Sequence, residues 1–221
     1  MKHGLKTLVL RKTKVIIKTR AIIIKEEVVK ESDKRLVVLT KNLGKILIYA
    51  RGAKNIKSKF IVMTQFSYVD LILRKGSGFY SLNEVSLIES FYNLRLDYDR
   101  LETAYFITNI INQNIIGEMD EHESSSFLFL LLQSLNFLNK GISNVLVKSV
   151  FILKFLSLNG EEPTIEKNKI ITEYEEIELP SNILEAVSYI LKSDTKKAFT
   201  FKITNLEILE SYCVKLLRAY V

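Results

Sequence analysis

The sequence predicts an α+β protein in two parts, an N-terminal β-barrel followed by an all-helical domain. Short β-branched segments separated by turn residues fill the chain to about residue 82, and apolar residues recur at helical spacing beyond it. The net charge is positive before residue 76 and negative after it. We therefore expect a barrel domain over residues 19–82, a helical domain over 83–221 and an N-terminal extension over 1–18.

The composition is typical of a folded protein in a reducing compartment. Hydrophobic residues make up 48% of the 221 residues and charged residues 26%, which argues against extensive disorder. The single cysteine, Cys213, cannot form an internal disulfide, and the four thiols of a structural zinc site are absent. The N-terminus lacks a secretory signal, and the apolar stretch 127–132 is far shorter than the ~20 residues that cross a bilayer. We expect a cytoplasmic protein without membrane contact.

Six β-branched segments predict the strands of the barrel. They cover residues 15–17, 21–29, 35–40, 45–50, 69–74 and 78–82, with turn residues at 31–33, 42–44 and 75–78. Residues 53–65 predict a short helix or an irregular connection. Three strands, a connecting helix and a final hairpin are typical of the five-stranded OB-fold. Polar and apolar positions alternate along the third strand, so we expect Tyr49 and Arg51 to share one face.

Helices are predicted where apolar residues recur every three to four positions. One face of the first helix is expected to carry Leu101, Ala104, Tyr105, Thr108, Ile111 and Ile115. The serines at 124–126 can cap a helix that runs to Asn139. Further helices are expected at about 143–158, 181–192 and 204–220. The acidic, cysteine-free segment 161–179 predicts a linker or a weak hairpin.

The charge is divided between the two parts of the chain. Residues 1–75 hold 19 lysines and arginines against 5 acidic residues, a net charge of +14. Residues 76–221 hold 13 against 20, a net charge of −7. Such a one-sided distribution is expected of a domain that binds a polyanion, although a solvated basic face is the alternative.

A basic segment directly follows the third strand. Residues 51–59 contain four cations, which are well placed to contact a phosphate backbone. The segment lacks the glycine-lysine-serine ending of a nucleotide-binding phosphate loop. Tyr49, beside Arg51, is the best candidate for stacking on an unpaired base, whereas we expect Phe60 and Phe66 in the core.

The sequence gives little support to catalysis or metal binding. His122 lies in an acidic segment, 117–123, and no second histidine or cysteine stands at metal-ligand spacing. The glutamates of segment 173–178 show no spacing that pairs an acid with a base. Cys213 occupies an apolar helical stripe, so we expect a buried thiol. We expect neither an enzyme nor a cofactor.

Several short motifs follow one another in a defined order along the chain. In the barrel region they are Lys30-Glu31-Ser32-Asp33-Lys34-Arg35-Leu36-Val37-Val38-Leu39-Thr40, Gly44, Ala50-Arg51-Gly52-Ala53-Lys54 and Ser58-Lys59. Beyond it they are Gly78-Phe79, Phe91-Tyr92-Asn93-Leu94-Arg95, Ala104-Tyr105-Phe106 and Leu156-Ser157-Leu158-Asn159-Gly160 followed by Pro163. Each motif is degenerate, but their order and spacing together are specific, and they extend over about 20–165. In residues, order and spacing these motifs resemble the RecO family, and the resemblance identifies the chain as a RecO-like protein.

The resemblance implies a recombination mediator in DNA repair. It implies binding of single- and double-stranded DNA, annealing of complementary strands, and partnership with RecR and the C-terminal tail of single-strand-binding protein while RecA is loaded. Many members carry a four-cysteine zinc module near 161–179, where this chain has no cysteine, so a metal-free variant is expected.

The charge division then suggests which residues would contact DNA. The expected DNA-binding residues are Lys34, Arg35, Lys41, Lys45, Tyr49, Arg51, Lys54, Lys57, Lys59, Arg74 and Lys75. For the tail of the single-strand-binding protein, the candidate contacts are Lys140, Lys148 and Lys154, beside the central helices. Localisation at the nucleoid in the cytoplasm would follow. Two alternatives remain open, an RNA-binding OB-fold module with a helical oligomerisation domain and an adaptor for acidic proteins.

Overall fold

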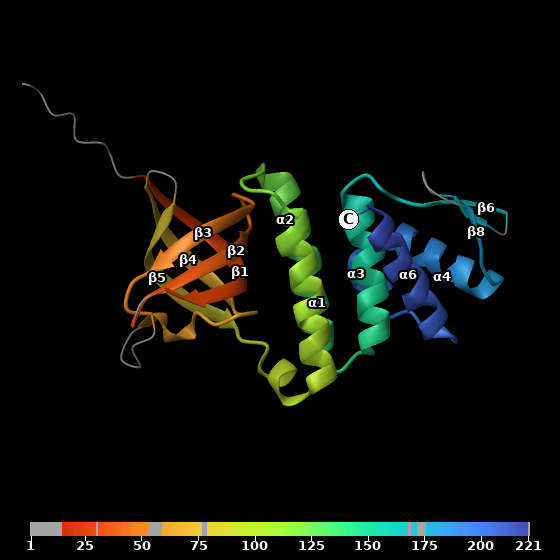
Figure 1. Cartoon of the computed structure of the whole chain (residues 1–221), viewed down its shortest axis with the longest axis horizontal. Helices are drawn as coiled ribbons and strands as arrows, with labels where there is room; N and C mark the ends of the chain where they lie inside the picture. Colours follow the sequence, from red (N-terminus) through yellow and green to blue (C-terminus); the bar gives the residue numbers. More distant parts are fainter. Residues whose placement is uncertain are drawn as a thin grey trace, which may run out of the picture.

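The structure is a computed structural model that describes residues 15–29, 31–53, 59–76, 79–167, 169–171 and 176–220. The chain is elongated, with the strands of the N-terminal part at one end and the helices stacked beyond them (Figure 1). This arrangement confirms the predicted α+β class, with a sheet-rich N-terminal domain followed by helices.

Five strands form the N-terminal domain. They are β1 (Ile16–Val28), β2 (Lys34–Thr40), β3 (Lys45–Ala50), β4 (Tyr68–Lys75) and β5 (Tyr80–Glu89). They pair in the order β1-β2-β3-β5-β4, and β4 pairs again with β1, which closes the sheet into a barrel. All pairings are antiparallel except that of β3 with β5. The short helix η1 (Lys59–Val62) lies between β3 and β4, within the region where a connection was expected.

The first strand is longer than the sequence suggested. The two expected segments at 15–17 and 21–29 are one strand, whose start pairs with β4 from Ile16 onward. Residues 16–18, expected in an extension, therefore belong to the barrel. At the other end, β5 continues to Glu89, past the boundary expected at residue 82.

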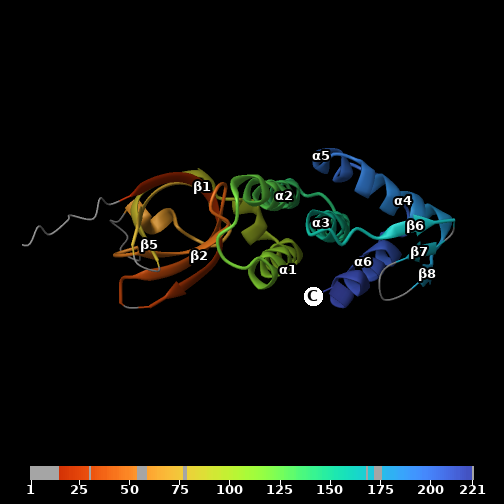
Figure 2. The same cartoon turned by 90° about the horizontal axis from the view of Figure 1, so that it is seen from above.

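Six α-helices follow the barrel among the described residues. They are α1 (Tyr98–Asn114), α2 (Glu121–Asn139), α3 (Asn144–Leu158), α4 (Ser181–Lys192), α5 (Thr195–Ala198) and α6 (Leu206–Tyr220), with the short helix η2 (Tyr92–Leu96) before α1. Seen from above, α1 and α2 form a layer beside the barrel, and α3 to α6 lie beyond it (Figure 2).

Capping explains where two of these helices begin. Ser143 caps α3, since its side chain accepts a hydrogen bond from the amide of Leu146. The serines at 124–126 do not cap α2, contrary to the sequence prediction. Asp120 takes that place and accepts a hydrogen bond from the amide of Glu123, so the helix starts at Glu121, ahead of the three serines.

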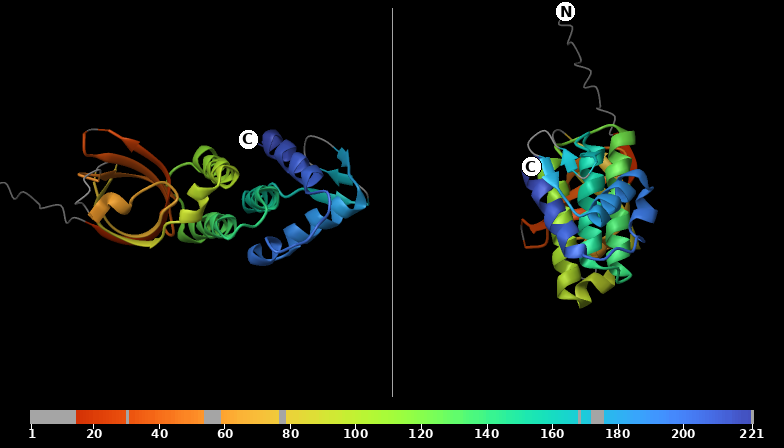
Figure 3. Two further views of the ribbon diagram at one scale, coloured as in Figure 1. Left: turned by 90° about the horizontal axis from the view of Figure 1, so that it is seen from below. Right: turned by 90° about the vertical axis from the view of Figure 1, so that its right-hand side faces the viewer.

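The helical part also contains a small sheet, so the expectation of an all-helical domain is wrong at this point. Strands β6 (Thr164–Glu166), β7 (Lys169–Ile171) and β8 (Glu176–Glu178) pair antiparallel in the order β6-β7-β8. They lie at the end of the molecule far from the barrel (Figure 3). Ile170 of β7 is buried and joins the helical core. This sheet occupies the segment expected to be a linker or a weak hairpin.

Two hydrophobic clusters hold the fold together. One fills the barrel, with Ala21 and Ile23 among its members. The other joins the helices to the outside of the barrel, where Ile22, Ile24 and Phe66 pack on α1 and α2. The apolar run in β1 is thus continuous because its residues are buried on both faces. No described helix is long and apolar enough to cross a membrane.

Candidate nucleic-acid interface

An aromatic pair lies on the outer surface of the barrel. Side chains of β3 alternate between buried and half-buried, so Ile48 points into the barrel while Tyr49 points outward. The Tyr49 and Phe79 rings meet edge to face with centroids 5.4 Å apart. Phe79 directly precedes β5 and is 42% exposed. Such rings offer a stacking surface to an unpaired base.

Two arginines belong to the same part of the barrel, one on β2 and one in the turn after β3. Arg35 of β2 stands opposite Tyr49 in the register and forms an ion pair with Glu27 of β1. The hydrogen bond that Arg35 donates to Glu27, together with the negative charge of Glu27, raises the pKa of the Arg35 guanidinium. Arg51 is exposed in the turn after β3. We call the surface formed by Arg35, Tyr49, Arg51 and Phe79 the barrel face.

The turn that carries Arg51 is fixed by its next residue. Gly52 has φ of 67°, in the left-handed region that favours glycine. Its amide donates a hydrogen bond to Asp33 Oδ1 at 2.9 Å. This contact ties the turn to the segment before β2 and fixes the backbone next to Arg51.

A hydrogen-bonded triad lies where the barrel meets the segment between α1 and α2. The Tyr80 hydroxyl donates to Glu118 Oε1 at 2.6 Å, and Lys75 Nζ lies 3.3 Å from Glu118 Oε2. The hydrogen bond from Tyr80 lowers the pKa of Glu118, and burial together with Glu118 raises the pKa of Tyr80. Contact with Tyr80 and Glu118 raises the pKa of Lys75, so this ammonium stays charged but is partly neutralised by Glu118.

Three further lysines predicted to bind DNA are engaged within the protein. Lys34 is 8% exposed, and its ammonium donates to Glu26 Oε2 at 2.7 Å and to the carbonyl of Met63. Lys45 donates to the carbonyl of Asn112, and burial lowers the pKa of its ammonium. Lys41 remains exposed but lies 3.6 Å from Glu121 Oε1. Lys34 is therefore not accessible to a phosphate in this structure, and its inclusion among surface contacts was wrong.

Of the remaining barrel cations predicted to bind DNA, the structure describes the side chain of Arg74 only. Arg74 is exposed at the end of β4. Lys54 and Lys57 lie outside the described residues, and the description of Lys59 is limited to its backbone in η1. Arg51 is thus the one cation of the basic segment 51–59 whose side chain the structure describes, and it is exposed.

Two of the three lysines proposed for partner binding have structural roles. Lys154 Nζ donates to the carbonyls of Leu191 and Ser193 at 2.9 and 2.6 Å, at the end of α4, and burial lowers its pKa. Lys148 forms an ion pair with Glu210 at 3.2 Å and lies over the Phe106 ring. These two lysines join α3 to neighbouring helices and are not free surface cations.

The third lysine is placed differently. Lys140 is exposed, with its ammonium 5.8 Å from the centre of the Phe137 ring. Of the three, it is the one that a partner could reach without displacing an internal contact.

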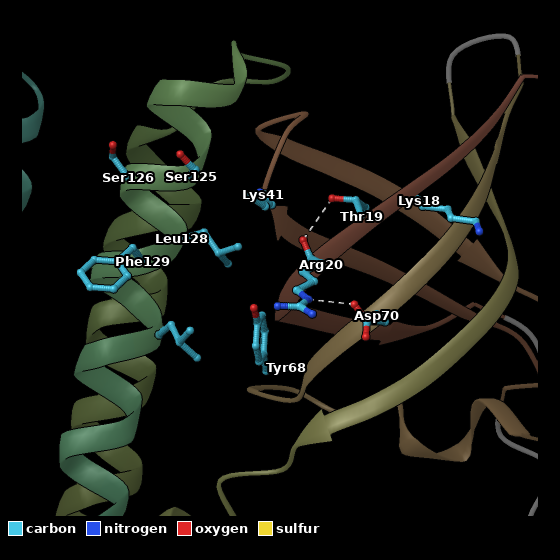
Figure 4. Close-up of a pocket in the computed structure, with 11 residues that line it drawn as sticks. Lys18, Thr19, Arg20, Lys41, Tyr68, Asp70, Ser125, Ser126, Leu128 and Phe129 are labelled. Carbon is cyan, nitrogen blue, oxygen red and sulfur yellow. Dashed lines mark hydrogen bonds and ion pairs between the residues drawn. The ribbon is translucent and has the colours of Figure 1, made fainter.

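A groove that the sequence did not reveal lies between the barrel and α2. It has a volume of about 660 Å³. Its barrel wall carries Lys18, Arg20, Tyr68 and Asp70, and its helix wall carries Leu128 and Phe129 (Figure 4). We call it the barrel–helix groove. The sequence pattern that could have indicated this surface is the alternation in β1, where Lys18 and Arg20 are exposed on either side of the buried Thr19.

The described residues contain no group of three or more histidine, cysteine or acidic side chains arranged to hold a metal ion. His122 is exposed in the first turn of α2, where its carbonyl accepts hydrogen bonds from Ser125 and Ser126. Cys213 is buried, as the sequence predicted, and burial raises the pKa of its thiol.

Comparison with known proteins gives a family for this architecture. Residues 14–91 match the family described as "Recombination protein O N terminal". This match covers the barrel strands and the barrel face, including the motifs around Lys34 and Arg51.

Curated relatives extend the match into the helices. The chain is 36% identical over 151 residues to "DNA repair protein RecO" of Acetivibrio thermocellus, which covers 67% of this chain and 59% of that protein. It is 34% identical over 155 residues to the protein of the same name in Clostridium novyi, covering 69% and 59%. The protein of that name in Thermoanaerobacter sp. matches over 93% of this chain and 91% of its own length, at 25% identity. In the first two comparisons, the chain spans about three fifths of the relative's length.

Proposed function

Because the chain belongs to the RecO family of DNA repair proteins, we propose that it is a recombination mediator. It would bind single- and double-stranded DNA, anneal complementary single strands, and help load RecA on strands coated with single-strand-binding protein. Its protein partners would be RecR and the C-terminal tail of the single-strand-binding protein. We propose no enzymatic activity and no cofactor, and a cytoplasmic location at the nucleoid.

The observation that carries this proposal is the barrel face. An edge-to-face aromatic pair, Tyr49 and Phe79, lies on the outside of a small closed barrel, with Arg35 opposite Tyr49 on β2 and the exposed Arg51 two residues beyond Tyr49. The strand order β1-β2-β3-β5-β4 supports the assignment of this barrel as an OB-fold, whose second and third strands commonly form the binding surface for oligonucleotides. Arg35 belongs to β2 and Tyr49 to β3, so the barrel face occupies the same position.

The chemistry of the barrel face suits annealing. Two single strands repel each other through their phosphates, and guanidinium groups reduce this repulsion while releasing bound counterions. Stacking on Tyr49 and Phe79 holds bases without reading their sequence, since every base has an aromatic face. Base pairing itself then selects the complementary strand. The proposed reaction makes and breaks no covalent bond, so it requires no catalytic group.

The helical part is proposed to contact proteins. Lys140 is the preferred contact for the acidic, apolar tail of the single-strand-binding protein, because Lys148 and Lys154 are used within the helices. We expect Lys140→Glu to weaken the binding of a tail peptide. Unchanged peptide affinity in a fluorescence anisotropy titration would exclude Lys140 as a contact.

Affinity for single-stranded DNA tests the barrel face. Fluorescence anisotropy with a labelled oligonucleotide should show that Arg51→Glu and Tyr49→Ala weaken binding. Loss of one phosphate contact should also reduce the salt dependence of the Arg51→Glu variant by about 0.7 in log–log slope. Lys202→Glu, which changes an exposed cation on the helical part, is the matched control and should bind normally.

Two outcomes would oppose the proposal. Normal affinity and salt dependence in Arg51→Glu, with an intact circular dichroism spectrum, would remove the barrel face as the site. Tighter binding to single-stranded RNA of equal length would favour an RNA-binding module instead.

A further inference from the structure

The barrel–helix groove contains cations that the barrel face does not use. Lys18 of β1 is exposed and has no ion-pair or hydrogen-bond partner among the described side chains. Arg20, two residues along the same strand, pairs with Asp70 of β4 at 3.1 Å. Lys41, which lines the same groove, lies 3.6 Å from Glu121. Three cations therefore border one wall of the groove.

The two ion pairs of the groove are exposed to solvent. The side chains of Arg20 and Asp70 are 58% and 53% exposed, and those of Lys41 and Glu121 are 56% and 66% exposed. Exposed pairs of this kind contribute little to stability, so an incoming phosphate can exchange with either carboxylate at small cost. Arg20 and Lys41 are thus available to an anionic ligand.

Two aromatic residues line the groove, one from the barrel and one from α2. Tyr68 belongs to β4, and Phe129 of α2 is 42% exposed (Figure 4). The ammonium of Lys196, in α5, lies 5.9 Å from the centre of the Phe129 ring. A fourth, exposed cation on α5 therefore lies beside an aromatic residue that lines the groove.

We propose that the barrel–helix groove is a second binding site for a single nucleic-acid strand, separate from the barrel face. Cations along a path combined with exposed rings are the pattern by which proteins bind unpaired strands without sequence preference. The site extends over separate elements, β1, α2 and α5, which suits a ligand with charges repeated along its length. This inference rests on the proposed DNA-binding function.

The position of the groove indicates how a second site would assist annealing. The strands close into a ring in the order β1-β2-β3-β5-β4, with β4 next to β1. The groove borders β1 and β4, so it lies across the barrel from β3, which carries Tyr49. One molecule can then hold two strands on different sides of the barrel. Holding both strands on one molecule raises the effective concentration of each for the other, which favours their encounter.

Stoichiometry of strand binding tests this inference. Native mass spectrometry of the full chain with oligothymidylate of about eight nucleotides, a length that an OB-fold accommodates, counts bound strands directly. We expect two strands on the wild type and one on Lys18→Gln/Arg20→Gln. One strand is also expected on Tyr49→Ala/Arg51→Glu, and none when the four changes are combined.

Single substitutions make the test more specific. Phe129→Ala should weaken the second binding event, whereas Tyr98→Ala removes a ring that is 78% exposed away from the groove and should leave both events unchanged. Asp70→Asn should strengthen the second event, because it releases Arg20 from its ion pair without adding a charge. Circular dichroism of each variant verifies that the fold is intact.

The outcomes separate this inference from the proposed function. A wild type that binds one strand, or a Lys18→Gln/Arg20→Gln variant that still binds two, overturns the second site and leaves the barrel face standing. A wild type that binds no strand overturns the proposed function. Loss of binding to an acidic, phenylalanine-containing peptide in the groove variant, with both strands retained, would identify the groove as a peptide site instead.

Discussion

Substitution of Gly44 by alanine tests how the barrel is joined to the helices. Gly44 lies in the turn between β2 and β3 with φ of 73°. A Cβ atom at this position would lie 2.7 Å from both the carbonyl oxygen of Gly117 and the amide nitrogen of Met119. Because both of these are backbone atoms, the segment between α1 and α2 would have to move away from the barrel.

The cost of this movement can be estimated from the contacts that it breaks. The amide of Lys45 donates to the Gly117 carbonyl at 3.0 Å, and the amide of Met119 donates to the Leu43 carbonyl at 3.4 Å. The amide of Gly44 donates to Ser124 Oγ at 2.8 Å. Each hydrogen bond contributes about 1 kcal/mol, and a left-handed alanine costs about 1 kcal/mol more. We expect Gly44→Ala to reduce the free energy of unfolding by about 4 kcal/mol.

Gly52 provides a matched control for the backbone strain. Its φ is 67°, but a Cβ atom there would meet no heavy atom within 4 Å. Gly52→Ala should therefore cost only the strain of a left-handed residue, about 1 kcal/mol. Urea unfolding followed by far-ultraviolet circular dichroism measures both variants, since the chain has no tryptophan. Equal losses in Gly44→Ala and Gly52→Ala would refute the close contact between the barrel turn and the α1–α2 segment.

Three other predictions concern ionisable groups. The folded protein lowers the pKa of Glu118, so its contribution to stability is present at neutral pH and is lost as the pH falls through that lowered value. The Glu118 side chain is 52% exposed, so solvent screening keeps this contribution small; Glu118→Gln should be about 0.5 kcal/mol less stable than wild type at pH 7 and equal to it in acid. A gap in urea midpoints that persists in acid would contradict this. Cys213 should not react with a thiol reagent until the protein unfolds, because the thiol is buried and its pKa is raised. Rapid labelling in native buffer would argue against the placement of α6. Lys154→Met should destabilise the helical part by about 1–3 kcal/mol, because the carbonyls of Leu191 and Ser193 lose their hydrogen-bond donor. Unchanged thermal unfolding would show that this contact is absent in solution.

The strands and most helices could be predicted because their signals are local. Alternation along β3 put Tyr49 on the face opposite Ile48, and apolar spacing predicted a helix at about 143–158, where α3 lies. The start of α2 was misplaced because Ser124 serves a distant contact. Its hydroxyl donates to the carbonyl of Thr40 at 2.6 Å and accepts from the amide of Gly44, 80 residues away. No local pattern distinguishes such a serine from a helix cap.

The candidate site was predictable only in part, for the same reason. A lysine looks alike in the sequence whether it is exposed or buried, and Lys34 is buried because Glu26 and the carbonyl of Met63 meet it in the folded barrel. The acidic residues 118 and 121 stood out in the sequence only as part of the acidic segment 117–123, yet they pair with Lys75 and Lys41. Phe79 becomes a neighbour of Tyr49 through the parallel pairing of β3 with β5. Each of these facts depends on contacts between segments far apart in the chain.

Annealing of complementary strands is the decisive test of the proposed function. Two strands carrying a donor and an acceptor dye are coated with single-strand-binding protein and mixed with the full chain, with and without RecR, while energy transfer is followed. We predict that the wild type accelerates annealing and that Tyr49→Ala/Arg51→Glu does not, whereas Lys202→Glu behaves as the wild type. Annealing at the uncatalysed rate with the wild type, or full acceleration with the Tyr49→Ala/Arg51→Glu variant, would contradict a mediator that works through the barrel face.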